Sequence, residues 1–188
     1  MAKVYVFMAD GCEEIEALTP GDLLRRAGVE VRMVSVMGRK DVCGAHKIIF
    51  EADLLFEETD FSDGDVFMLP GGMPGTTNLA AYQPLMELLR EKGKEGKRLA
   101  AICAAPAVIL GMNGFLQGKK AVCYPGMDDK LLGAEVQKAA VVTDGNITTS
   151  RGMGTAIAYG LEIIRLLQGE EAAAKMKTSV VYGHGRQD

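Results

Sequence analysis

The sequence predicts one α/β domain over residues 1–188, built on a mostly parallel sheet with helices on both faces. Short apolar runs alternate with helical patterns along the chain, and this alternation is typical of strand–helix–strand units in a parallel sheet. The chain has 188 residues, of which 48% are hydrophobic and 24% are charged, which suits a single domain with a full core. No internal repeat, low-complexity tract or linker divides it.

The first half of the chain contains three predicted buried strands, rich in apolar and β-branched residues. They cover residues 4–8, 29–36 and 66–69. A helix is predicted over residues 13–27, interrupted or kinked near Pro20 and ended by Gly28. Residues 47–50 are predicted to be a short edge strand or part of a hairpin.

The second half contains a fourth core strand, residues 99–102, which runs directly into Cys103. Four helices are expected, over residues 85–93, 105–110, 155–167 and 170–177. The third has Ile157, Leu161 and Ile164 on one stripe, as a helix packed on a core requires. Further strand candidates are residues 121–124, 140–142 and 147–149, and residues 183–188 are predicted to be a disordered end.

Charge and hydropathy argue against two classes of partner. The net charge is -4, and no Lys/Arg cluster is long enough to neutralise a row of phosphates, so nucleic-acid binding is not expected. No apolar run approaches the roughly 20 residues that span a bilayer. The first nine residues lead straight into a strand-like segment and do not resemble a secretion signal. We therefore expect a cytoplasmic protein without membrane contact.

The four cysteines are widely and irregularly spaced, at Cys12, Cys43, Cys103 and Cys123. No Cys-x-x-Cys pair is present, so neither a zinc site nor a disulfide framework is expected, and we predict no metal. Most cysteines in such a chain are small buried hydrophobes, which is the alternative to a reactive role for each of them.

The sharpest local pattern is the apolar strand that ends on Cys103. Active sites of parallel sheets lie beyond the carboxyl ends of the strands. The following Pro106 suits a first helical turn, and a nucleophile on such a strand-to-helix turn is exposed at the top of the sheet. The amino end of a helix favours thiolate over thiol, so the pattern predicts an unusually acidic Cys103.

Glu16 follows the first strand and lies about one turn into the predicted helix. Glutamates at a helix start complement its dipole, and we expect Glu13 and Glu14 to do only this. Glu16 is placed to point across the sheet top towards Cys103. A carboxyl group there can stay protonated, donate to a thiolate and move protons in catalysis.

Glycines follow the third strand in the segment from Pro70 to Gly75. They allow a backbone amide to face a bound oxyanion, although a plain tight turn is the simpler reading. A dinucleotide fingerprint is excluded because the third glycine is misplaced and no clear helix opens at once.

Four segments together resemble the ThiJ/PfpI superfamily, closest to the branch of the parkinsonism protein (DJ-one) and bacterial YajL. They are the loop with Glu13, Glu14 and Glu16, the Leu69-Pro70-Gly71-Gly72 turn, the Ala101-Ile102-Cys103-Ala104-Ala105-Pro106 turn, and residues 149–155. The resemblance runs over nearly the whole chain. It implies a flavodoxin-like three-layer sandwich, usually a homodimer, that works without a cofactor.

The resemblance also implies roles for single residues. Cys103 matches the nucleophile and oxidation-sensitive cysteine of the family, and Glu16 matches its partner carboxylate. The backbone amides of Gly72 and Ala104 match the oxyanion hole. Gly71, Tyr124 and Arg151 are predicted to line the site. Many relatives carry a histidine where this chain has Tyr124, and some carry an arginine in the stretch occupied here by residues 44–46.

Three functions remain open from the sequence. The first is a glyoxalase or deglycase that acts on small reactive aldehydes, converting methylglyoxal to lactate through the Cys103 thiolate. The second is an oxidative-stress sensor whose Cys103 is oxidised to sulfinate with little turnover. The third is a chaperone or binding module that needs an exposed apolar surface. The resemblance also argues against a cysteine–histidine peptidase, because the protease-like branch of the superfamily has a histidine directly after its cysteine, where this chain has Ala104.

Overall fold

The structure is a computed structural model, and it describes residues 2–183 of the chain. Its centre is a seven-stranded sheet in the order β10-β11-β7-β6-β1-β2-β5. These strands span Lys3–Met8 (β1), Glu30–Ser35 (β2), Leu54–Leu55 (β5), Val66–Leu69 (β6), Arg98–Ile102 (β7), Val141–Asp144 (β10) and Ile147–Ser150 (β11). All neighbours in this sheet are parallel except the edge strand β10, which pairs antiparallel with β11. The predicted α/β fold is confirmed.

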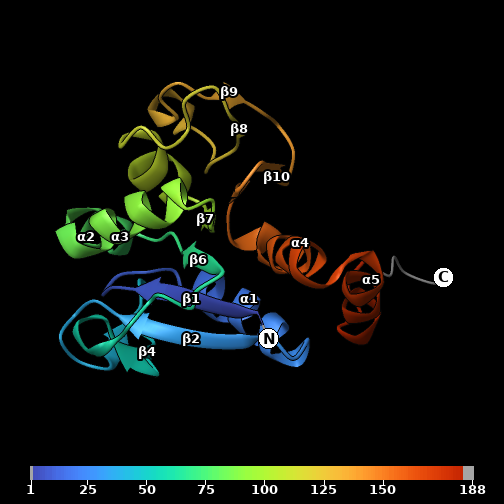
Figure 1. Ribbon diagram of the computed structural model, residues 1–188, viewed down its shortest axis with the longest axis horizontal. Helices are drawn as coiled ribbons and strands as arrows, with labels where there is room; N and C mark the ends of the chain where they lie inside the picture. Colours follow the sequence, from blue (N-terminus) through green and yellow to red (C-terminus); the bar gives the residue numbers. More distant parts are fainter. Residues whose placement is uncertain (1, 184–188) are drawn as a thin grey trace.

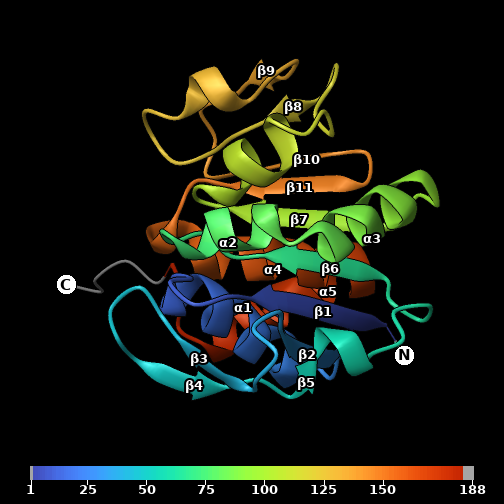
Figure 2. The same cartoon turned by 90° about the vertical axis from the view of Figure 1, so that its left-hand side faces the viewer.

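Helices cover both faces of the sheet (Figures 1 and 2). One face carries α1 (Glu14–Arg26), α4 (Ala156–Gln168) and α5 (Glu170–Ser179). The other carries α2 (Gly75–Ala81), α3 (Gln83–Lys94) and the π-helical segment η2 (Pro106–Gly111). Side chains of β1 alternate between these layers: Val4 and Val6 pack towards α1 and α4, and Tyr5 and Phe7 pack towards α2 and α3. The result is the predicted three-layer sandwich.

Two small pairings lie outside the main sheet. Strands β3 (Asp41–Cys43) and β4 (Ile49–Glu51) form an antiparallel hairpin, and β8 (Lys120–Ala121) pairs with β9 (Glu135–Val136). The remaining short turns are η1 (Phe56–Glu58), η3 (Asp128–Lys130) and η4 (Met153–Thr155). The hairpin agrees with the strand-or-hairpin alternative predicted for residues 47–50, although Lys47 lies outside β4 with a φ of 67°.

Three local predictions are wrong. Helix α1 continues through Pro20 as one element, because Pro20 lies on the buried side of the helix, packed against α4. No clear helix was predicted directly after the glycine turn, because the segment Gly-Thr-Thr-Asn-Leu-Ala-Ala has no helical pattern of apolar residues. In the structure this segment forms helix α2. The strand expected over residues 121–124 reaches only Ala121, and the chain then turns through Tyr124 above the sheet. The predicted disordered end covers residues 183–188. Of these, only Gly183 is among the residues that the structure describes.

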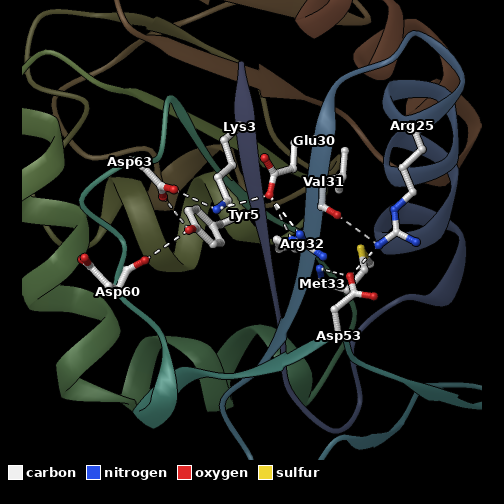
Figure 3. A network of polar contacts seen from close by, with 10 residues as sticks. All are labelled: Lys3, Tyr5, Arg25, Glu30, Val31, Arg32, Met33, Asp53, Asp60 and Asp63. Carbon is white, nitrogen blue, oxygen red and sulfur yellow. Dashed lines mark hydrogen bonds and ion pairs between the residues drawn. The ribbon is translucent and has the colours of Figure 1, made fainter. Parts of the chain in front are cut away.

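Polar contacts secure the amino-terminal edge of the sheet, away from Cys103 (Figure 3). Lys3 Nζ lies 2.8 Å from Asp63, and the Tyr5 hydroxyl donates a 2.7 Å hydrogen bond to the same carboxylate. Arg25 on α1 pairs with Asp53, which also accepts the Met33 amide of β2. These contacts join the strands to the helix layer and the connecting loops.

The carboxyl ends of the central strands meet at one edge, as the predicted crevice requires. In the register of the sheet, Leu69 of β6 faces Ala101 of β7, and Ile102 of β7 faces Ser150 of β11. The segments after these strands therefore lie side by side. Within residues 2–183, no helix is both long and apolar enough to cross a membrane.

Candidate active site

Cys103 lies at a sharp turn at the end of β7. Its φ is 66°, a left-handed conformation that residues other than glycine rarely adopt and that often marks functional sites. Hydrogen bonds hold both sides of the turn: the Cys103 amide donates to Ser150 O at 2.9 Å, and the Tyr124 amide donates to Cys103 O at 2.7 Å. The side chain is half-buried, and the thiol is free. The predicted strand-to-helix turn is confirmed.

Two backbone amides face the Cys103 sulfur, those of Gly72 and Ala104. They are the amides that the family resemblance matches to an oxyanion hole. Gly72 has a φ of +84°, and a Cβ there would lie 2.2 Å from the Glu13 amide nitrogen, so only glycine fits. The chain can therefore direct this amide towards the sulfur only because residue 72 has no side chain.

Glu16 is held directly beside this sulfur. It lies in the first turn of α1, with 2% of its surface exposed. Its Oε2 accepts a 2.9 Å hydrogen bond from the Gly71 amide, and its carboxyl group is in hydrogen-bonding contact with the Cys103 thiol. A Cβ at residue 71 would lie 2.6 Å from both Glu16 Oε2 and Cys103 Cβ. Glycine at 71 thus lets the carboxyl and the sulfur approach each other.

Burial makes Glu16 an acid that titrates near neutral pH. Desolvation raises the pKa of its carboxyl group to about 7, against the opposing hydrogen bonds from Cys103, Gly71 and the Met153 amide. The nearby charge of Glu13 raises the pKa further. A carboxyl group that is protonated in part of the population at pH 7 suits proton transfer in either direction.

The predicted unusual acidity of Cys103 is wrong. Burial, followed by the negative charge of Glu16, raises the pKa of the thiol to about 12, and the Gly72 and Ala104 amides offset only part of this. The Cys103 thiol and the Glu16 carboxyl group titrate as a coupled pair. Near neutral pH, the thiolate forms most readily when the thiol proton moves to the Glu16 carboxylate. A charged Glu16 thus opposes the ionisation of the thiol rather than favouring it.

Tyr124 lies at the exposed rim of this site, with 51% of its surface accessible. A Cβ at Gly152 would lie 3.5 Å from Tyr124 Cδ2 and 3.8 Å from Glu16 Oε1, so Gly152 separates the ring from the carboxyl group. Arg151 is half-buried, and its charge offsets only a small part of the burial and the Asp128 charge that raise the pKa of Cys123 to about 12. It makes no ion pair with Glu16 in the described part of the chain. Gly71 and Tyr124 thus lie where the sequence predicted, and a lining role for Arg151 stays a prediction.

A sequence model of the DJ-1/PfpI family matches residues 2–166. The chain belongs to the DJ-1/PfpI family. This bears out the resemblance seen in the four sequence segments, and it fits the flavodoxin-like sheet described above.

Several curated members of the DJ-1/PfpI family are similar over most of the chain. Protein DJ-1 homolog B of Arabidopsis thaliana is 38% identical over 180 residues, which are 95% of this chain and 41% of that protein. The chain thus spans less than half the length of this plant relative. The Parkinson disease protein 7 homolog of Danio rerio is 33% identical, covering 95% of this chain and 96% of the relative. A protein of Pyrococcus abyssi named a deglycase is 32% identical, and the match covers 88% of this chain and 99% of that protein.

Solved structures of the family share the fold at full length. Oxidised DJ-1 of Toxoplasma gondii superposes with a TM-score of 0.94 at 36% identity, covering 98% of this chain and 100% of that one. The turns that carry Cys103 and Glu16 therefore belong to a fold that the DJ-1/PfpI family shares as a whole.

A second charged cluster, missed by the sequence analysis, lies beside the site. The buried Glu14 accepts the His46 amide at 2.8 Å, and its carboxylate lies 3.1 Å from His46 Nδ1. Glu13 lies 3.3 Å from the same nitrogen. Potential ligand atoms of the three residues lie within 4.8 Å of one another, but the His46 ring already pairs with both carboxylates. Glu14 thus secures the β3–β4 hairpin to α1, beyond the helix-dipole role predicted for it.

Proposed function

We propose that this protein is a cysteine-dependent, cofactor-free enzyme of the glyoxalase or deglycase type that acts on small reactive aldehydes or their adducts. The observation that carries the proposal is the contact of the Cys103 thiol with the Glu16 carboxyl group, beneath the amides of Gly72 and Ala104. A relative named a deglycase supports the same class of chemistry.

The first step in this proposal is attack on the aldehyde carbon of methylglyoxal. The Cys103 thiol gives its proton to the Glu16 carboxylate, and the sulfur forms a bond to the carbonyl carbon. The developing alkoxide lies against the Gly72 and Ala104 amides, which stabilise it until the Glu16 carboxylic acid returns the proton, giving a hemithioacetal and restoring the Glu16 carboxylate.

Glu16 then moves a proton between adjacent carbons. Its carboxylate removes the hydrogen from the former aldehyde carbon, and the resulting enediol is reprotonated at the neighbouring carbon. This leaves a lactoyl thioester on Cys103, which water hydrolyses to lactate and free thiol. One carbon is oxidised while its neighbour is reduced, so the sequence of steps needs no external oxidant or reductant. For a deglycase substrate, an amine is the leaving group from the aldehyde adduct.

The raised pKa of Glu16, about 7, suits both halves of this reaction. The carboxylate is needed to accept a proton, and the carboxylic acid is needed to return it. Lactate formation from methylglyoxal by wild type, Cys103→Ala and Glu16→Gln tests the proposal. We expect both variants to lose at least about a hundredfold in rate, as for a lost nucleophile or general acid–base group. Equal rates in all three proteins would rule the enzyme out.

A second candidate, an oxidative-stress sensor, is favoured by two observations. One solved relative of high similarity is an oxidised DJ-1. In this chain a partly protonated Glu16 can donate a hydrogen bond to a sulfinate oxygen on Cys103. Two equivalents of peroxide convert the thiol to sulfinic acid and release two water molecules. Mass spectrometry of the protein after mild peroxide treatment tests the sensor hypothesis. If Cys103 gains oxygen no faster than Cys43, the hypothesis is excluded.

We also propose a homodimer through the face that joins α1 to the β3–β4 hairpin. Four exposed aliphatic side chains lie there: Ile15, Leu18, Ile48 and Ile49. The contacts between His46 and Glu14 tie the hairpin to the start of α1, so the two exposed pairs belong to connected elements. Light scattering tests this homodimer. We expect wild type to be a dimer and Ile49→Glu to be a monomer, and a monomeric wild type would contradict the proposal.

A cytoplasmic location stays a prediction.

A further inference from the structure

Tyr159, on α4, is a buried residue that the proposed reaction does not yet use. Only 1% of its surface is exposed. Within residues 2–183, its hydroxyl is the one buried side-chain nitrogen or oxygen without a hydrogen-bond partner. An unpaired buried hydroxyl costs free energy, and phenylalanine would fill the same space without that cost. The hydroxyl therefore requires an explanation beyond packing.

The packing of α4 against α1 places Tyr159 near Glu16. At the contact, a Cβ on Gly160 would lie 3.2 Å from Pro20 Cα and 2.8 Å from a Leu23 methyl group. Pro20 is one turn after Glu16 on α1, and both helices begin at the carboxyl edge of the sheet. Helical side chains lean towards the amino end of their helix, so the Tyr159 ring leans towards the edge where Glu16 lies. Tyr159 and Cys103 also pack in the same apolar cluster.

The charges around the two groups agree with this placement. Complete burial, then the negative charge of Glu16, holds the pKa of Tyr159 well above its ordinary value, so the phenol stays a neutral donor. Glu16 in turn is faced by Cys103 after β7, by Glu13 on its own helix, and by the amides of Gly71 and Met153. No lysine, arginine or histidine is among these groups. The Tyr159 hydroxyl is thus a neutral buried donor on the helix that packs against α1, close enough to Glu16 to feel its charge.

Building on the proposed function, we propose that Tyr159 is a positioning residue whose hydroxyl donates a hydrogen bond, through one buried water molecule, to the Glu16 carboxylate. Buried waters commonly bridge polar groups that have no direct protein partner. A donor at this place stabilises the ionised carboxylate, which is the form that accepts the thiol proton. Tyr159 then opposes the effect of desolvation on the Glu16 carboxyl group.

Titration of the Glu16 carboxyl carbon by ¹³C NMR tests this in wild type and Tyr159→Phe. The Glu16 signal is assigned by its loss in Glu16→Gln. Removal of the hydroxyl should raise the midpoint by about one pH unit, the usual effect of one hydrogen bond to a charged group. Tyr5→Phe is the matched control, because the Tyr5 hydroxyl bonds to Asp63 at the opposite edge of the sheet. It should leave the Glu16 midpoint unchanged.

Thermal unfolding separates a positioning role from a merely structural one. At pH 5, where Glu16 is protonated in both proteins, Tyr159→Phe should melt close to the wild-type temperature, and Tyr5→Phe should melt below it. Coinciding Glu16 midpoints in wild type and Tyr159→Phe would overturn the inference, whatever the melting temperatures. The titration needs no turnover, so a protein that forms no lactate but shows the shift refutes the proposed function alone. A protein that forms lactate with an unmoved midpoint refutes the role of Tyr159 alone.

Discussion

The Gly71 amide donates a 2.9 Å hydrogen bond to Glu16 Oε2, and this contact joins the loop after β6 to the first turn of α1. It fixes one carboxyl oxygen while the carboxyl group also contacts the Cys103 thiol. The acid comes from the first turn of α1, and the thiol and the amides come from the segments after β6 and β7, which the sheet register brings to the same edge.

Gly71→Ala should disrupt the site more than the fold. The added methyl group would lie 2.6 Å from both Glu16 Oε2 and Cys103 Cβ, so the two side chains must separate. We expect at least about a tenfold slower alkylation of Cys103 or loss of lactate formation, and a cost of about 1–3 kcal/mol in the free energy of unfolding. Gly154→Ala is the matched control, because a Cβ there meets no atom within 4 Å. Equal behaviour of the two variants would contradict the close approach at residue 71.

Glu16 should make stability depend on pH. Its folded-state pKa of about 7 lies above the ordinary value of 4.5 for a glutamate, so its contribution is fully present below about pH 4.5 and is lost as pH rises through 7. The loss amounts to about 3 kcal/mol at most, since each pKa unit corresponds to about 1.4 kcal/mol. Urea unfolding of wild type and Glu16→Gln at pH 5 and pH 8 should show the variant gaining relative stability at pH 8. A difference independent of pH would show that Glu16 is not buried as described.

His46 should stabilise the β3–β4 hairpin only while it is protonated. Glu14, then Glu13, raises the pKa of the His46 ring above its ordinary value of 6.5. Its contribution is therefore present below about pH 6.5 and is lost as pH rises through the higher folded-state pKa. His46→Ala should lower the melting temperature at pH 6 and have less effect at pH 9. An equal loss at both values would show that the His46 ring contributes independently of its charge, and no loss at either value would assign the contact to the backbone amide, which His46→Ala keeps.

Local sequence patterns were sufficient to find the parallel sheet, Cys103 and Glu16. Both residues can be recognised from a short segment. Cys103 ends an apolar run shortly before Pro106, and Glu16 lies one turn into the helix that follows the first strand. The glycines at 71 and 72 were also visible, and the structure shows why side chains are excluded there.

Features that depend on distant residues were not visible in this way. Glu14 and His46 are 32 residues apart, so their contact follows from how the hairpin folds over α1. The predicted direction of the Cys103 pKa shift was wrong, because burial and the Glu16 charge raise the pKa by more than the nearby backbone amides lower it. Helix α2 was missed because it is short, begins at Gly75 and buries only three residues against the rest of the fold.

The central claim is that Cys103 and Glu16 share a proton. The most direct test is the rate of Cys103 alkylation by iodoacetamide as a function of pH, in wild type and in Glu16→Gln. The wild-type profile should bend near pH 7, where Glu16 titrates, and rise again only at much higher pH. In Glu16→Gln the bend should disappear and leave the ionisation of a single thiol, at a lower pH than the second rise of the wild type. Superimposable profiles for the two proteins would contradict the claim.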